Sequence, residues 1–443
     1  MTQQTPQQYP LAVSNSIEVE EPFKGDLLGR KNLASRLTSY LDRLKAGAVL
    51  AIDAKWGDGK TWFGKNWAKQ LQEADHRVIF VDAFEQDYVD DPFILIAAEI
   101  AQALDNAQED THNFREKTAG VMKAILPVGT KVLFNAIGRI ALGSADISED
   151  IKDAVESAND SAADMAEKWI EDKLKNYAEE KESLKHFKDA LKQMAESQPK
   201  PIVIIIDELD RCRPSFAVKL IERIKHFFDV PNVVFVLLIN RKQLEEAIRG
   251  VYGQGTEASE YLGKFVNFFF QLPKQHLDKY ISKKYIERYI DQVFENFHFE
   301  ITQDTEQFKN RFCSLAIHFN FSLRDIERGV ALFAFSLPIN ELIYSVLPYV
   351  IALKISKPDI YQGLIKNEIK AHEMAQSNIA SLLEDNNDWF INAIYEWHTA
   401  HVSNFKEIGK NFELLKRGFY KFDIDSKGFF NFVAQKIDLP LEL

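Results

Sequence analysis

Residues 48–63 read AVLAIDAKWGDGKTWF, an apolar run followed by the turn GDGKT at 57–61 and then by a helical pattern. A strand, a glycine turn and a helix in this order constrain the chain to a phosphate-binding loop, whose backbone N–H groups surround the β- and γ-phosphates of a nucleotide. Lys60 neutralises phosphate charge, Thr61 offers its hydroxyl to Mg²⁺, and Ala54 replaces the usual first glycine. We expect these residues to contact a nucleoside triphosphate: Trp56, Gly57, Asp58, Gly59, Lys60, Thr61 and Trp62.

Five apolar runs alternate with helical patterns along the chain. They lie at 48–53, 77–82, 201–207, 232–239 and 265–273. Strands that are apolar throughout and are separated by helices indicate a parallel sheet covered on both faces. The predicted fold class is therefore α/β: a P-loop NTPase core with a five-stranded, mainly parallel sheet, a helical insertion between the second and third strands, and an all-helical C-terminal region.

Composition and periodicity divide the chain into six segments. Residues 1–22 are polar and rich in Gln and Pro, which indicates a disordered lead with no targeting signal. The other predicted segments are 23–106 (first part of the core), 107–199 (helical insertion), 200–275 (second part of the core), 276–365 (helical lid) and 366–443 (C-terminal helical region).

The insertion has two dissimilar parts. Residues 119–145 are apolar, but basic residues interrupt the run and a proline and a glycine break it, so it does not read as a membrane-spanning helix. We favour packing of this segment against protein, with contact to an anionic membrane surface as the alternative. The remainder is charged and rich in Ala, which predicts one or two exposed helices. We favour a solvated helical hairpin, and a coiled-coil contact with another subunit is the alternative.

The formal net charge of −12 argues against a protein that coats nucleic acid, and no strong nucleic-acid signal is present. Cys212 and Cys313 belong to no metal-binding or paired spacing, so we expect reduced thiols in a cytoplasmic protein.

An acidic pair follows the third apolar run, in IVIIIDELDRCRP. We expect this run to neighbour the P-loop strand. Asp207 then holds Mg²⁺ opposite Thr61, and Glu208 polarises the attacking water.

Polar side chains elsewhere are candidates for sensing the γ-phosphate. Asn240 ends the fourth run and reaches the water or the γ-phosphate if that strand lies between the other two; a simple turn former is the alternative. Arg324 and Arg328 lie one helical turn apart, and one of them could report nucleotide state from the helical lid. The alternative is a solvated arginine or one paired with Asp325.

Two further pairs of residues have predicted roles that depend on self-association of the chain or on the position of the bound nucleotide. Arg211 and Arg213 follow the acidic pair and are the candidates for an arginine finger if the chain self-associates into a ring. Asp26 and Arg30, in GDLLGR, could frame the adenine and ribose.

These residues together resemble the KAP family of P-loop NTPases, within the class that uses an additional catalytic glutamate. Trp56 before the glycine turn and the run 207–211, an acidic pair followed by Leu-Asp-Arg, are typical of the family. The matching segments are DLLGR (26–30), AKWGDGKTWF (54–63), VIFVDAFEQDYVDDPF (78–93), IIIDELDRCRPSFAVKLIERIKHFF (204–228), NVVFVLLINRKQLEEAI (232–248), EYLGKFVNFFFQLP (260–273) and FSLRDIERGV (321–330).

The resemblance implies ATP hydrolysis coupled to a conformational change and, in bacteria, a place in phage-exclusion or other defence systems. Many relatives carry transmembrane helices where this chain has its insertion, and often Asp where it has Asn240.

Three hypotheses follow. The leading one is an ATPase switch or motor that acts on a partner, through self-association or a separate effector protein. A nucleotide-gated scaffold with little turnover is the second. The third is an effector within 366–443, where Glu368, His372 and Glu373 come nearest to a cleavage site but read better as a solvated helix face.

Overall fold

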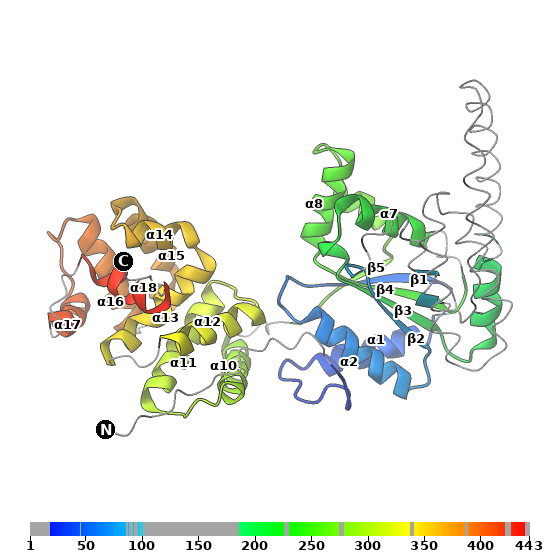
Figure 1. The fold of residues 1–443 in the computed structure, drawn as a ribbon, viewed down its shortest axis with the longest axis horizontal. Helices are drawn as coiled ribbons and strands as arrows, with labels where there is room; N and C mark the ends of the chain where they lie inside the picture. The colour runs from blue at the N-terminus through cyan, green and yellow to red at the C-terminus, as the bar shows by residue number, and fades with distance from the viewer. Residues whose placement is uncertain are drawn as a thin grey trace, which may run out of the picture.

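The computed structural model comprises an α/β domain and a helical domain (Figure 1). It describes residues 18–44, 46–85, 87, 92, 96–97, 99–100, 185, 187–225, 230–273, 279–336, 341–385, 389–420 and 427–438. Most of the predicted insertion, including 119–145, and the lead at 1–17 lie outside the described residues.

One parallel sheet organises the α/β domain. Its strands are β1 (Ala48–Asp53), β2 (Val78–Asp82), β3 (Ile202–Asp207), β4 (Val233–Ile239) and β5 (Phe268–Gln271). The order is β2-β3-β4-β1-β5, and all four pairings are parallel. The fold class predicted from the sequence is confirmed. The expectation that the Asp207 strand neighbours the P-loop strand is wrong, because β4 lies between β3 and β1.

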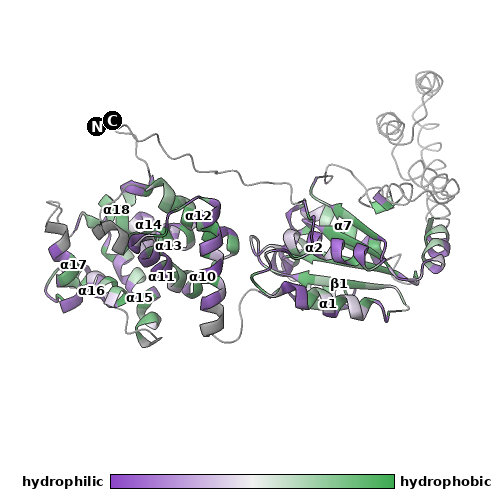
Figure 2. Ribbon diagram, turned by 90° about the horizontal axis from the view of Figure 1, so that it is seen from below, coloured by the Kyte–Doolittle hydropathy of each residue, from purple (hydrophilic) through white to green (hydrophobic). Residues whose placement is uncertain are grey.

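Alternate residues of the central strands enter two different cores. In β1, Leu50 and Ile52 pack with α1 (Arg30–Leu41) and α2 (Lys60–Glu73), whereas Val49 and Ala51 point to the other face. That other face is covered by α7 (Pro214–Ile224), α8 (Arg241–Tyr252) and α9 (Ala258–Gly263). Figure 1 shows α1 and α2 on one side of the sheet and α7 and α8 on the other, and Figure 2 shows the apolar character of β1. Burial on both faces explains why the strands read as continuous apolar runs.

The end of the predicted insertion belongs to the core. Residues 187–197 are helical, and Phe187, Leu191 and Ala195 are each 0 % exposed and pack on the α7 side of the sheet. This part of 107–199 is therefore not an exposed helix, because its apolar residues recur at helical spacing and form one face that packs against the sheet.

One apolar core runs through the helical domain, from Ile286 to Ile437. The predicted boundary at 365 therefore divides helices that pack together, since α14 (Pro358–Ile365) and α15 (Ile369–Asp385) contribute to the same core. The helices are α10 (Lys279–Asn296), α11 (Gln303–His318), α12 (Leu323–Phe335), α13 (Glu341–Ser356), α14 (Pro358–Ile365), α15 (Ile369–Asp385), α16 (Trp389–Val402), α17 (Lys410–Tyr420) and α18 (Phe429–Asp438).

Within the described part of the chain, no helix combines the length and apolar character needed to cross a bilayer. Cys212 and Cys313 are buried free thiols, and burial raises the pKa of each to about 12.

Candidate functional site

The turn between β1 and α2 has the backbone of a phosphate-binding loop. Gly57 and Gly59 adopt φ angles of 81° and 77°, a left-handed conformation that glycine takes without steric cost. Gly59 is also the N-cap of α2, and no side chain caps that helix. The amides of the first turn are therefore directed at the loop without a side-chain acceptor, an arrangement suited to an anion.

Lys60, the first residue of α2, is drawn back into the loop. Its Nζ donates to the carbonyls of Ala54 (3.1 Å) and Lys55 (3.4 Å) and lies 3.9 Å from Asp210 Oδ2. Only 9 % of the side chain is exposed. Phosphate oxygens are stronger hydrogen-bond acceptors for an ammonium group than neutral carbonyls are. The Lys60 side chain therefore lies where its Nζ can exchange these two carbonyls for the oxygens of a bound triphosphate.

Asp210 connects the two halves of the site. It lies in the short helix η1 (Leu209–Arg211), and its carboxylate accepts a hydrogen bond from Trp56 Nε1 as well as facing Lys60. The side chain is 1 % exposed, and Oδ1 is buried with no hydrogen-bond partner. Sequence reasoning gave Asp210 no role. The only signal was its place in a run typical of the family.

The acidic pair lies at the carboxyl end of β3. Thr61 Oγ1 donates to Glu208 Oε1 at 3.3 Å, and the Glu208 amide donates to Asp207 Oδ1 at 2.8 Å. Glu208 itself has a φ of 60°, a left-handed conformation, and its side chain contacts Thr61 in the first turn of α2. The structure thus brings Thr61, Asp207 and Glu208 together, as expected from the sequence.

Burial shifts the acidity of both carboxyl groups. Desolvation raises the pKa of Asp207, opposed by hydrogen bonds from Thr61 and the Glu208 amide and by the charge of Lys60. Desolvation, and then the neighbouring Asp207 charge, raise the pKa of Glu208 to about 7, although Arg211 lowers it. Two carboxylates this close share an unfavourable charge that a bound cation would relieve.

The residues present fit a Mg²⁺–triphosphate. Asp207 Oδ2 is buried with no hydrogen-bond partner, and it shares the site with Thr61 Oγ1. Those two oxygens would hold the cation, with phosphate oxygens and water completing its shell. Within the described residues, no group of three or more His, Cys, Asp or Glu side chains is arranged as a metal site on its own.

The contacts of Arg30 lie at the P-loop, and the expected place of Arg30 and Asp26 beside the adenine and ribose stays a prediction. Its guanidinium is buried and donates to the carbonyls of Asp58 (2.6 Å), Gly59 (3.4 Å) and Pro273 (3.2 Å). Desolvation lowers the pKa of Arg30 to about 10. Asp26 accepts hydrogen bonds from the Leu28 and Lys31 amides, so it fixes the start of α1. Arg30 therefore stabilises the backbone of the P-loop through these hydrogen bonds.

Asn240 follows β4 and is the N-cap of α8. Because β4 lies between β1 and β3, the condition set for its approach to the γ-phosphate is met. Its side chain makes no capping hydrogen bond to α8. The role of Asn240 as a phosphate or water sensor stays a prediction.

The first turn of α12 touches the P-loop. The Arg324 amide donates to the Gly57 carbonyl at 3.2 Å, and Ser322 and Arg324 approach so closely that a Cβ on Gly57 would lie 2.7 Å from each side chain. Arg328, one turn further on, pairs with Asp325 at 3.8 Å and is 65 % exposed. Of the two candidate sensors, only Arg324 lies at the loop.

Both candidate finger residues are paired within their own chain. Arg211 forms an ion pair with Glu208, and Arg213 donates to Asp87 through both its backbone amide, at 2.9 Å, and its guanidinium. Either contact must break before an arginine reaches a neighbouring subunit.

A glycine turn between a parallel strand and a helix, a lysine within it, and an acidic pair ending a second strand define a P-loop NTPase domain. The chain belongs to the KAP family, because the model of the KAP family P-loop domain matches residues 30–340. A search of the curated proteins finds no match.

Solved structures match the chain only at low sequence identity and low TM-score. The Aeropyrum pernix ORC2 protein in its ADP form is 12 % identical, with 96 % of each chain covered and a TM-score of 0.35. DnaA from Aquifex aeolicus bound to AMPPCP is 12 % identical, again with 96 % of each chain covered, at a TM-score of 0.28. TM-scores this low carry no argument about activity.

Proposed function

We propose that the protein is a Mg²⁺-dependent ATPase whose hydrolysis cycle changes the contact between the helical domain and the P-loop. The observation that supports this most directly is the Thr61–Glu208 hydrogen bond, which places a carboxylate beside the predicted cation and phosphate groups. Glu208 then accepts a proton from the attacking water, Lys60 neutralises phosphate charge, and Arg324 approaches the γ-phosphate from α12. Bound Mg²⁺ supplies charge neutralisation on the phosphates.

Two substitutions test this proposal. Lys60→Ala is expected to abolish tight ATP binding, whereas Glu208→Gln should bind ATP but not turn it over. Phosphate release and nucleotide binding by the purified protein are the measurements. If Glu208→Gln hydrolyses ATP as fast as the unaltered protein, Glu208 is not the base and the mechanism fails.

A nucleotide-gated scaffold with little turnover is the second candidate, and one contact favours it. The Glu208 carboxylate is engaged by Arg211, so the base is restrained in this state. In this candidate, nucleotide binding itself selects the conformation that recruits a separate effector protein. Phosphate release that stays negligible both with and without a candidate partner, although ATP binds, is the expected outcome for the scaffold.

A role in defence against phage extends the proposal on the strength of the family resemblance alone. Cells that carry the gene are expected to lower phage plaque counts, and Lys60→Ala should remove that protection. Equal plaque counts with and without the gene would contradict this extension.

A further inference from the structure

The carboxylate of Asp53 joins three elements at the carboxyl end of the sheet. Asp53 is the half-buried last residue of β1, and the P-loop follows it directly. Its Oδ1 accepts a hydrogen bond from the Arg241 amide at 2.9 Å, and its Oδ2 accepts one from Gln271 Nε2 at 2.6 Å. Arg241 is the first residue of α8, which follows β4, and Gln271 is the last residue of β5. Because β4 and β5 are the two neighbours of β1, one side chain connects the P-loop strand to both sides of its sheet.

Asp53 satisfies the start of α8 in a way that leaves Asn240 out of the helix cap. Asn240 occupies the N-cap position, but its side chain makes no capping hydrogen bond. Asparagine is among the preferred residues at this position, where its side-chain oxygen ordinarily accepts from the first turn. The first turn of α8 also contains no acidic residue. The Asp53 carboxylate supplies the negative charge that the positive end of a helix favours.

The position of Asn240 gives this arrangement its significance. Ile239 pairs with Asp53 in the register of β1 and β4, and the Ala54 amide donates to the Ile239 carbonyl at 3.0 Å. The chain therefore reaches Asn240 at the level of the sheet where β1 passes into the P-loop. Without the Asp53 carboxylate, the amides at the start of α8 would compete for the Asn240 side chain, which would turn toward the helix and away from the loop.

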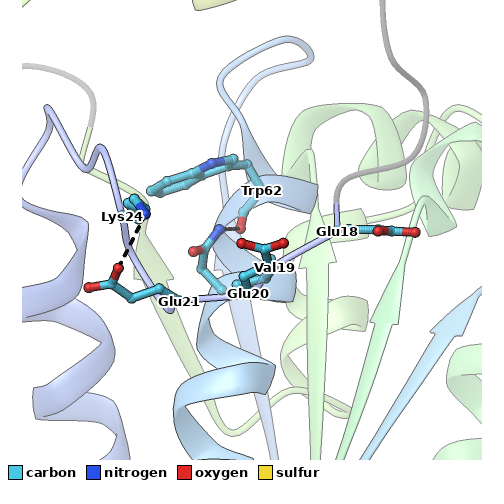
Figure 3. Close-up of a pocket in the computed structure, with 7 residues that line it drawn as sticks. Glu18, Val19, Glu20, Glu21, Lys24 and Trp62 are labelled. Atoms are coloured by element: carbon cyan, nitrogen blue, oxygen red, sulfur yellow. Dashed lines mark hydrogen bonds and ion pairs between the residues drawn. The ribbon is translucent and has the colours of Figure 1, made fainter.

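The P-loop helix α2 has anchoring contacts of its own that do not involve Asp53. The Phe23 amide donates to the buried Asn66 of α2 at 2.6 Å, and Figure 3 shows the Trp62 ring extending from α2 towards Lys24 in the same segment. These contacts lie on the α1–α2 side of the sheet, whereas α8 covers the opposite face. Loss of the Asp53 contacts should therefore disturb the start of α8 and leave α2 in place.

We propose that Asp53 is a positioning residue for ATP hydrolysis, which holds the start of α8 so that the Asn240 side chain can face the γ-phosphate or the attacking water. This inference rests on the proposed function. The Gln271 contact restrains the orientation of the carboxylate, because its second oxygen is held at the same time as the first. Asp53 acts through Asn240, and its own part is orientation and not proton transfer.

Steady-state hydrolysis separates this positioning role from a purely structural one. Asp53→Ala should lower kcat about tenfold to a hundredfold and change the KM for ATP less than about twofold, because the group it orients acts on the transition state. Asp53→Asn keeps an acceptor oxygen for the Arg241 amide and should restore most of kcat. Thr302→Ala, the matched control, removes the side-chain acceptor of the Thr305 amide at the start of α11 in the helical domain. It should leave both constants unchanged.

A double-mutant cycle tests whether Asp53 acts through Asn240. Asn240→Ala alone should lower kcat, and adding Asp53→Ala should lower it no further, because the two residues act as one unit. An unchanged kcat in Asp53→Ala, or two reductions that multiply in the double variant, would overturn the positioning role while the proposed function stands. Failure of the unaltered protein to hydrolyse ATP would overturn the proposed function and the positioning role with it.

Hydrogen exchange gives a readout that does not depend on activity. The Arg241 amide should exchange slowly in the unaltered protein and in Thr302→Ala, and about tenfold faster in Asp53→Ala, because its acceptor is then gone. Equal exchange of this amide in all three proteins would show that Asp53 does not hold the start of α8, and would overturn the proposal.

Discussion

Trp56 and Asp210 join, side chain to side chain, two motifs that lie 154 positions apart in the chain. The same carboxylate faces Lys60, so one buried charge touches both the residue before the glycine turn and the lysine within it. A buried carboxylate close to the triphosphate site opposes the binding of an anion. We therefore expect Asp210 to lower nucleotide affinity, although it also contacts Lys60.

Asp210→Asn should tighten ATP binding about tenfold, because it removes a negative charge near the phosphates and preserves the side-chain shape. Titration with a fluorescent ATP analogue measures this. Glu246→Gln, at an exposed carboxylate on α8, is the control for a general change in net charge. Weaker binding by Asp210→Asn would show instead that the carboxylate places Lys60 for phosphate.

Residues within local motifs were predictable from the sequence. Lys60, Thr61, Asp207 and Glu208 follow from strand, turn and acidic-pair patterns, because the carboxyl ends of strands in one parallel sheet share an edge. Neither the contacts of Asp210 with Trp56 and Lys60 nor the hydrogen bonds of Arg30 to the P-loop backbone were predictable in this way. Their contacts depend on where η1 and α1 lie in the tertiary structure, which no local spacing encodes.

Helix α12 is the element that links the two domains at the site. Its N-cap, Ser322, forms a capping box with Asp325, so these contacts fix the first turn against the Gly57 carbonyl. Under the proposed function, this contact is where a shift of the P-loop would reach the helical domain. The sequence predicted the helix and both arginines on it, but not which of them faces the loop.

Arg324→Ala should lower the rate of phosphate release about a hundredfold while ATP binding changes little, since the arginine stabilises charge that develops in the transition state. Arg328→Ala on the same helix is the matched control, because Arg328 is exposed and paired with Asp325. Single-turnover hydrolysis and binding are measured for both variants. Equal rates for the two would remove Arg324 from the mechanism.

On the scale of the whole molecule, the helical domain contains buried imidazoles that the site does not use. His372 and His398 contact each other through their Nδ1 atoms at 2.9 Å, and Tyr349 contacts His398 Nε2 at 2.8 Å. Desolvation lowers the pKa of His372 to about 3 and that of His398 well below its usual value, and the His401 charge adds to both shifts. These rings are neutral in the folded domain.

Acid should therefore unfold the helical domain before the α/β domain. A histidine whose folded pKa is lowered stabilises the fold above its unfolded pKa of about 6.5, and this stability is lost as the pH falls toward 3. His372 alone accounts for about 2–4 kcal/mol across that window. Glu208 contributes to the pH dependence of folding stability with the opposite sign, because its folded pKa is raised to about 7. Its burial destabilises the fold least below pH 4.5, where the carboxyl group is protonated in both the folded and the unfolded state.

Hydrogen exchange measured at pH 7.5 and pH 5 reports the protection of the backbone amides in each domain separately. Peptides from α15 and α16 are expected to lose protection at pH 5, while those from β3 and β4 retain it. His398→Leu should reduce this pH dependence. Equal loss of protection in both domains would contradict the assignment to the histidines.

The edge position of β2 bears on how such a chain can evolve. Among the strands that the structure describes, β2 pairs with β3 alone, and the chain leaves the sheet after β2 and returns to it before β3. Segments of very different length can be gained or exchanged at this point without altering the registry that aligns Asp82 with Asp207. The same P-loop domain can thus acquire different inserted segments during evolution, and an engineer could graft a sensor domain at the same junction.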